Sequence, residues 1–124
     1  MGATKRHFYT ESQLEMANLC KALGHPARIT IIEKLSQNEN LNCTDLKEYI
    51  PLAQSTISRH LYILYEIGIL GYQVEKNSVL YKVNTKVVQI ISVYLKNSTK
   101  MALQKPIYNL YTYFKPLPEF YFKT

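Results

Sequence analysis

The fold is decided by one stretch, Pro51-Leu-Ala-Gln-Ser-Thr-Ile-Ser-Arg-His-Leu-Tyr-Ile-Leu-Tyr-Glu-Ile-Gly-Ile-Leu70. It predicts a tight turn followed by a helix with two different faces, since helical residues advance by about 100° each. The apolar face, which we expect to enter the core, carries Ile57, Leu61 and Leu64. The opposite face is polar, and it consists of Ser55, Arg59 and Tyr62, flanked by Thr56 and Ser58.

Short hydroxyl side chains around one guanidinium suit the edges of base pairs and phosphate oxygens. An ordinary amphipathic surface helix, polar on its outer face for solubility alone, accounts for the same pattern. The flanking sequence decides between the two interpretations.

Length and composition indicate one globular domain. The chain has 124 residues, of which 47% are hydrophobic, enough to build a core. The polar start at residues 1–12 is unlike a signal peptide, and no apolar run is long enough to cross a bilayer. Two cysteines are too few for a disulfide framework. We therefore expect a protein of the reducing cytoplasm with no membrane partner.

The net charge of +6 invites a nucleic-acid hypothesis, but its distribution weakens the simplest version. Residues 1–84 carry nine Lys and Arg against eight Asp and Glu, whereas residues 85–124 carry six against one. The excess therefore lies away from the stretch 51–70, and charge supports nucleic-acid binding only modestly.

Upstream of that stretch the sequence predicts an arm and three helices. Residues 1–10 are expected to form a flexible N-terminal arm. Thr10 with Gln13 matches a capping box that starts the first helix, and Gly24 is a natural stop.

Pro26 suits the first position of a second helix, and a short third helix is expected over 44–50. This third helix and the one in 51–70 would form a helix-turn-helix. The inward residues predicted on the second and third helices are Ile29, Ile31, Ile32, Leu35, Leu46, Tyr49 and Ile50.

Downstream, two β-like runs at 69–74 and 79–83 enclose a polar turn, which predicts a hairpin. Lys76 and Asn77 lie at its tip. A hairpin directly after a helix-turn-helix is a wing, whose tip can follow the DNA backbone or enter the minor groove. The expected fold class is mainly α (α+β), a winged helix-turn-helix.

A long C-terminal helix capped by Thr85 is predicted to reach about Gln104 with a broad apolar stripe. The winged unit can close its core without it, so we expect a partner subunit to cover this face and to make the chain a homodimer. The predicted dimerisation residues are Leu14, Val88, Ile91, Tyr94 and Leu95. The winged-helix and dimerisation domain is thus expected to span residues 11–105.

The tail at 106–124 is rich in aromatic residues and is expected to pack on the dimer. Tyrosine favours interfaces because one end is apolar and the other forms hydrogen bonds. The alternative is a small-molecule pocket lined by Tyr108, Tyr111, Tyr113 and Phe114.

Four segments at correct mutual spacing resemble the ArsR/SmtB family of bacterial winged-helix repressors. They are Lys21-Ala-Leu-Gly-His-Pro-Ala-Arg-Ile29, Gln54-Ser-Thr-Ile-Ser-Arg-His-Leu61, Tyr65-Glu-Ile-Gly-Ile-Leu70 and Tyr81-Lys-Val83. The resemblance covers roughly residues 11–100. It implies a homodimeric transcriptional regulator, with one recognition helix in each of two successive major grooves of a palindromic operator, released by an inducer.

The DNA-binding positions that the resemblance carries over are Gln54, Ser55, Thr56, Ser58 and Arg59. Arg59 is expected to bind a guanine or a phosphate, since its fork can bind either bidentately. Tyr62 follows from the helical geometry. His60 and Arg28 also match the family, and we expect a structural role for both, with Arg28 in an ion pair.

The family's metal sites are not matched. At the familiar Cys-x-Cys site, Asn42 and Thr44 hold the ligand positions and Cys43 the spacer. Residues 85–105, where the second familiar site lies, contain no His, Asp or Glu. We therefore expect no metal at either site and no cofactor. A site built from Cys20, Cys43, His7 and His25 is the alternative.

The predicted inducer is a small molecule or a redox signal. Cys20 and Cys43 are candidates for a thiol switch, against the alternative that each is a small apolar core residue. A winged-helix module that binds only protein is the second hypothesis for the whole chain. An enzyme is the weakest, because the sequence shows no nucleophile–base constellation and no phosphate-binding Gly loop.

Overall fold

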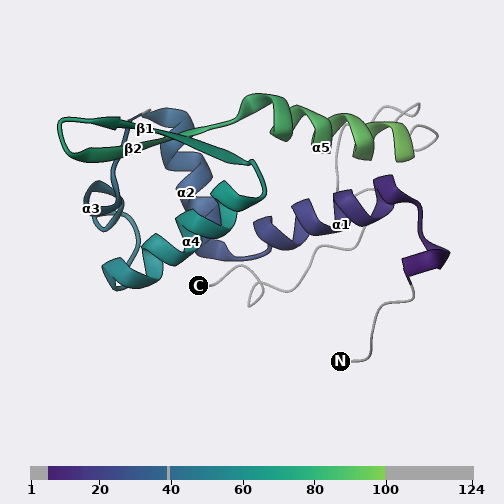
Figure 1. The fold of residues 1–124 in the computed structure, drawn as a ribbon, viewed down its shortest axis with the longest axis horizontal. Helices are drawn as coiled ribbons and strands as arrows, with labels where there is room; N and C mark the ends of the chain where they lie inside the picture. The colour runs from purple at the N-terminus through teal and green to yellow at the C-terminus, as the bar shows by residue number, and fades with distance from the viewer. Residues whose placement is uncertain (1–5, 39, 100–124) are drawn as a thin grey trace, which may run out of the picture. The chain divides into compact units, whose positions relative to one another are not determined.

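The computed structural model describes residues 6–38 and 40–99, and Figure 1 shows its helices and its hairpin. The elements in chain order are η1 (Arg6–Phe8), α1 (Glu11–Leu23), α2 (Pro26–Gln37), α3 (Cys43–Leu46), α4 (Gln54–Glu66), β1 (Leu70–Glu75), β2 (Ser78–Val83) and α5 (Thr85–Ser98). The predicted fold class is confirmed, because a helix-turn-helix (α3–α4) is followed by a two-stranded wing and a further helix.

Helix α1 begins at the predicted capping box. The Thr10 hydroxyl accepts from the Gln13 N–H at 3.1 Å, and the Gln13 side chain accepts from the Thr10 N–H at 2.9 Å. The helix ends at Leu23, and Gly24 follows with φ −78°, so the glycine stops the helix without adopting a left-handed conformation.

Helix α2 begins with Pro26 in its first turn, as predicted, and the His25 ring caps it by accepting from the Ala27 N–H at 3.0 Å. Its buried row is Ala27, Ile31 and Leu35. The core position predicted for Ile29 is wrong, since 43% of that side chain is exposed. The residues that face inward follow i, i+4, i+8 spacing from Ala27, which rotates the buried face away from Ile29.

Helix α3 is a single turn that starts one residue earlier and ends sooner than predicted. Asn42 and Asp45 form a capping box, with bonds of 2.8 and 2.9 Å. Leu46 and Ile50 are buried as predicted. The inward position predicted for Tyr49 is wrong: it is 45% exposed and lies under the Lys34 ammonium, 4.6 Å from the ring centroid. An exposed ring there offers its face to a cation.

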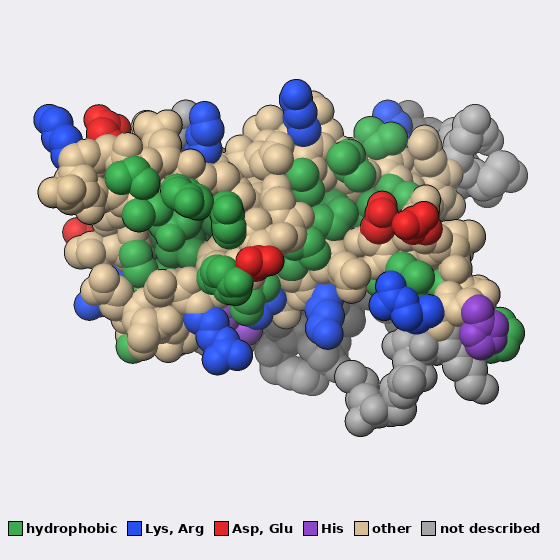
Figure 2. Space-filling view, viewed as in Figure 1, with side chains coloured by type: hydrophobic (Ala, Val, Ile, Leu, Met, Phe, Trp, Pro, Cys, Tyr) green, Lys and Arg blue, Asp and Glu red, His purple; other side chains and the backbone are tan. Residues whose placement is uncertain are grey.

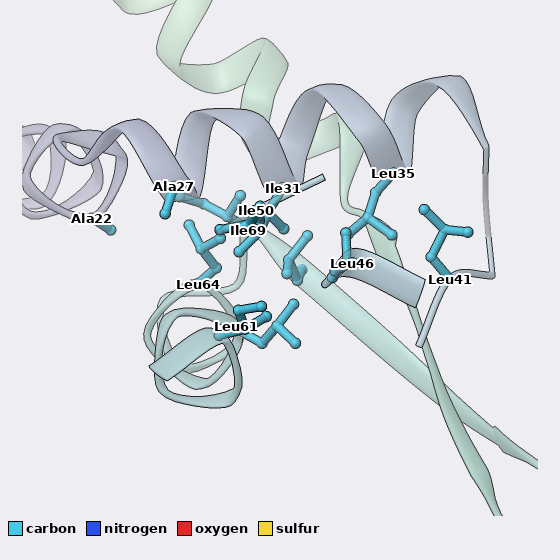
Figure 3. Packing of buried hydrophobic residues seen from close by; sticks show 12 residues of the cluster. Ala22, Ala27, Ile31, Leu35, Leu41, Leu46, Ile50, Leu61, Leu64 and Ile69 are labelled. Atoms are coloured by element: carbon cyan, nitrogen blue, oxygen red, sulfur yellow. The ribbon is translucent and has the colours of Figure 1, made fainter. Parts of the chain in front are cut away.

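The core lies between α2, α3, α4 and the start of β1, and Figure 3 shows its side chains converging there. Each fully buried Leu or Ile adds about 1.5–3 kcal/mol relative to leaving it exposed. The apolar face of α4 is therefore fixed against α2 and α3. The largest fully buried side chains are Ile31, Leu35, Leu46, Ile57, Leu61, Leu64 and Ile69.

The two strands pair antiparallel with Leu70 opposite Val83 and Glu75 opposite Ser78. The two residues between them, Lys76 and Asn77, have φ of 48° and 67°. Two consecutive positive φ values are typical of the hairpin turn that matches strand twist. The predicted wing and its tip are confirmed.

Helix α5 is capped by Asn84, whose side chain accepts from the Lys86 N–H at 3.2 Å. The predicted cap at Thr85 is therefore wrong by one residue, because Thr85 is already the first helical residue. The predicted extension to Gln104 and the tail at 106–124, with its aromatic side chains, lie outside the described residues.

The chain through Tyr94 forms one compact unit, and a second begins at Leu95. No helix among residues 6–38 and 40–99 is both long and apolar enough to span a membrane.

Candidate nucleic-acid interface

Helix α4 presents a continuous polar face to solvent. The apolar row of Ile57, Leu61 and Leu64 is fully buried, so the other side of the helix must face outward. Tyr62 is 60% exposed on that side. The residues predicted to bind DNA are all exposed, and on α4 they are Gln54, Ser55, Thr56, Ser58, Arg59 and Tyr62.

The N-terminus of α4 differs from those of α1, α2 and α3, which are capped by their own side chains. Ala53 precedes α4 and provides no side-chain cap. The Thr56 and Ile57 N–H groups bond to the Ala53 carbonyl, which leaves the N–H groups of Gln54 and Ser55 without a backbone acceptor among the described residues. Their partial positive charge favours an anion such as a phosphate.

His60 fastens α4 to α2. It is only 8% exposed, and its Nδ1 accepts a hydrogen bond from the Arg28 Nε at 3.1 Å. The His25 ring lies 4.4 Å from the His60 ring, centroid to centroid. Burial lowers the pKa of His60, and the nearby His25, Arg28 and Arg59 lower it further. His60 is thus a neutral residue at the edge of the core, the structural role predicted for it.

Arg28 is also structural, but not through an ion pair. Its Nη1 donates to the carbonyl of Ala22 at 3.0 Å and to that of Lys21 at 3.4 Å, in addition to the bond to His60. These carbonyls belong to the last turn of α1, where the helix leaves acceptors unsatisfied. The predicted ion pair is not found among residues 6–38 and 40–99, where Arg28 joins α1, α2 and α4 through neutral partners.

Glu66 was not among the predicted site residues, although it lies one helical turn after Tyr62. Its carboxylate accepts a hydrogen bond from the Tyr62 hydroxyl, and this bond raises the pKa of Tyr62. The spacing of four residues along a helix could have indicated the pair.

The wing extends from the same unit. Lys76 and Asn77 are exposed at the tip, as predicted. On the strands, the Tyr72 ring lies 5.2 Å from that of Tyr65 and 6.4 Å from that of Tyr81, and these contacts connect the base of the wing to the end of α4. The wing is thereby held in a fixed position relative to the polar face of α4.

Comparisons with known proteins match this architecture. The sequence pattern of bacterial regulatory proteins of the arsR family matches residues 25–72, from the start of α2 into the wing. The chain is 30% identical over 83 residues to the HTH-type transcriptional regulator YgaV of Escherichia coli, an alignment that covers 67% of this chain and 84% of that protein. This chain belongs to the ArsR family. Proteins of this family are transcriptional regulators that bind DNA.

Solved structures of similar proteins agree with the fold. The transcriptional repressor PagR of Bacillus anthracis is 31% identical, with a TM-score of 0.56 over 67% of this chain and 95% of that one. HlyU from Vibrio cholerae is 28% identical, with a TM-score of 0.59 over 72% of this chain and 96% of that one.

Metal ligands do not converge in the described part of this ArsR-family chain. Within residues 6–38 and 40–99, no three side chains of His, Cys, Asp and Glu lie close enough to hold an ion. The alternative metal site built from Cys20, Cys43, His7 and His25 therefore has no support in these residues.

The two cysteines are free thiols in different surroundings. Cys20 is exposed on α1, whereas Cys43 is half-buried at the start of α3 and packs against the core. The Cys43 thiol donates to the Gln54 carbonyl at 3.6 Å. Burial raises the pKa of Cys43, against a smaller opposing effect of Lys47, and so disfavours the reactive thiolate. Its environment suits a packing role, and the thiol switch stays a prediction.

Proposed function

We propose that this ArsR-family protein is a repressor that acts as a homodimer on a palindromic operator, with one α4 helix in each of two successive major grooves. The observation that carries the proposal is the exposed polar face of α4, held by a buried apolar face on a rigid core. Relatives are named repressors, among them PagR of Bacillus anthracis, 40% identical over 45 residues that cover 36% of this chain and 46% of that protein.

The proposed division of work on DNA follows from side-chain chemistry. Arg59 offers a rigid fork that can bind the O6 and N7 atoms of guanine. The hydroxyls of Ser55, Thr56 and Ser58 can donate to phosphates or to base edges. On the wing, Lys76 and Asn77 would contact the backbone, where they add affinity with little sequence information.

The proposed dimer contact uses α5. Exposed apolar side chains on this helix include Val88 (38%), Ile90 (56%) and Val93 (53%). Ile90 and Val93 lie one turn apart on the same side of α5, and exposed apolar neighbours of this kind are typical of an interface. Of the residues predicted from sequence, Val88 and Leu95 are exposed, Leu14 and Tyr94 are half-buried, and Ile91 is buried within the chain itself.

The proposal is tested by capture of genomic fragments on the purified full chain, followed by binding titrations of the recovered duplex. A sequence-specific repressor is expected to enrich one palindromic motif, and light scattering is expected to give the mass of two chains. A winged-helix module that binds only protein would retain no fragment above background.

The operator experiment also addresses the inducer. We propose that release follows a small molecule or a redox change rather than a metal at the family's usual sites, and that the protein acts in the cytoplasm. An oxidant or a divalent cation is added to the preformed complex at fixed ionic strength. Only the signal that acts as inducer is expected to shift the operator-binding curve.

A further inference from the structure

The junction of α1 and α2 forms a groove beside α4. It has a volume of about 480 Å³ and is lined by Asn18, Lys21, Ala22 and Arg28 on one side, and by residues of α4 that include Tyr62 and Glu66 on the other. Tyr62 belongs both to this groove and to the exposed polar face of α4. The groove is therefore a lateral continuation of the surface proposed to bind DNA.

Two cationic residues, Lys21 and Arg28, line the α1–α2 side of the groove. Arg28 is fixed by its bonds to His60 and to the carbonyls of Lys21 and Ala22. Those bonds use the Nε and Nη1 donors, and Nη2 has no hydrogen-bond partner among the described residues. An arginine that is immobilised through one edge and free at another is organised in advance for an oxyanion.

Lys21 is the second cation. Its side chain is exposed, while its carbonyl is the acceptor for Arg28. The Arg28 guanidinium is thus bonded to the backbone of the residue that carries the second positive charge. Figure 2 shows Lys and Arg side chains along the lower edge of the molecule, beneath α4 and α1.

Among the residues that line the groove, Glu66 is the acidic one, and it belongs to α4. Glu66 accepts the hydrogen bond from the Tyr62 hydroxyl on the α4 side. The arrangement therefore leaves the α1–α2 side basic and places the carboxylate on the opposite wall.

We propose that this groove binds a phosphate of the DNA backbone, with Lys21 and Arg28 as the contacting residues. The inference rests on the proposed function, since α4 must first enter the major groove. The major groove is about 12 Å wide, so a helix within it runs between two phosphate strands. The strand on the α1 side would then pass over Lys21 and Arg28. A phosphate of the bound DNA is favoured over a free anion because Tyr62 belongs both to the groove and to the face of α4 that is proposed to enter the DNA.

The test compares Lys21→Ala with Lys34→Ala in the full chain. Both changes remove one lysine from a helix, but Lys34 lies over the Tyr49 ring, outside the groove. Binding of the operator and of an unrelated duplex is measured at several salt concentrations. Lys21→Ala is expected to weaken both duplexes by the same factor and to reduce the slope of log K against log salt by about 0.9 for each phosphate that is no longer neutralised. Lys34→Ala is expected to retain the wild-type slope.

A second variant keeps the test independent of helix stability. Lys21→Gln keeps a long polar side chain without adding negative charge to the last turn of α1, and it is expected to lose the same affinity and salt slope as Lys21→Ala while the melting temperature stays near that of the wild type. An unchanged salt slope in both Lys21 variants, or a loss of affinity confined to the operator, would overturn the phosphate site alone. Failure of the wild type to bind any duplex would overturn the proposed function and this site with it.

Discussion

Two residues of α4 that lie two positions apart, Arg59 and Leu61, are expected to separate stability from DNA binding. Leu61 is fully buried in the core, whereas Arg59 is exposed on the polar face. Leu61→Ala removes three buried carbon atoms and leaves a cavity, which costs about 2–5 kcal/mol of unfolding free energy. Arg59→Ala leaves the core untouched, so its effect on unfolding is expected to stay within about 0.5 kcal/mol.

Binding is expected to show the reverse pattern. If Arg59 is bidentate to a base, Arg59→Ala costs about 1–3 kcal/mol of specific affinity, or roughly 5- to 150-fold. Leu61→Ala should bind the operator with nearly wild-type affinity under conditions where it remains folded, because its DNA-facing side chains are unchanged.

The assay is urea unfolding followed by circular dichroism, at one protein concentration because association shifts apparent stability. Operator titrations on the same preparations complete the comparison. The reasoning would be refuted by a Leu61→Ala variant that unfolds within about 1 kcal/mol of the wild type, below the range expected for such a cavity, or by an Arg59→Ala variant that binds the operator undiminished.

The other predictions concern polar contacts described above. Because the pKa of folded His60 lies below its unfolded value, the unfolded chain binds more protons as pH falls below about 6.5, so stability should decrease on acidification. In urea titrations at pH 7.0 and 5.0, His60→Phe should lose less unfolding free energy on acidification than the wild type does. An equal loss in both proteins would contradict the role given to His60. Asn42→Ala should cost about 0.5–2 kcal/mol through loss of the α3 cap, measured by urea unfolding, whereas Asn42→Asp should be nearly neutral. Asn77→Gly should leave stability unchanged or raise it slightly, since glycine adopts the positive φ at no steric cost, whereas Asn77→Val should lower the melting temperature.

The sequence predicts the structure best where the spacing of apolar residues fits a single kind of element. The two faces of α4 could be predicted because Ile57, Leu61 and Leu64 leave a single consistent direction for the core. The hairpin could be predicted because a polar pair separates two short apolar runs. In each case local chemistry and tertiary packing favour the same answer.

Apolar residues that offered a choice of faces were less predictable. On α2, Ile29 and Ile31 are both β-branched and apolar, and only packing against α4 decides that Ile31 is buried. The predicted burial of Tyr49 was wrong for a related reason, since a tyrosine can pack in the core or lie exposed under a lysine. Propensity does not distinguish these outcomes.

The candidate site has one part that the sequence predicts and one part that only the folded structure brings together. The polar face of α4 is contained in one segment of sequence, so its members could be named in advance. The groove brings Lys21 and Arg28 beside Tyr62 only through the turn between α1 and α2. Net charge gave no indication of it, because nine basic and eight acidic residues nearly cancel over residues 1–84.

The short connection between α1 and α2 limits where insertions and deletions can be tolerated in this chain. It consists of Gly24 and His25, and the His25 ring both caps α2 and lies against the His60 ring of α4. Surface loops usually accept insertions, since closing a longer loop costs little. One residue added between Gly24 and His25 would instead break the register between α1 and the start of α2, and with it the bonds from Arg28 to the α1 carbonyls. One residue added between Lys76 and Asn77 would alter only the wing tip. Indels should therefore accumulate at the hairpin and be excluded from the α1–α2 connection.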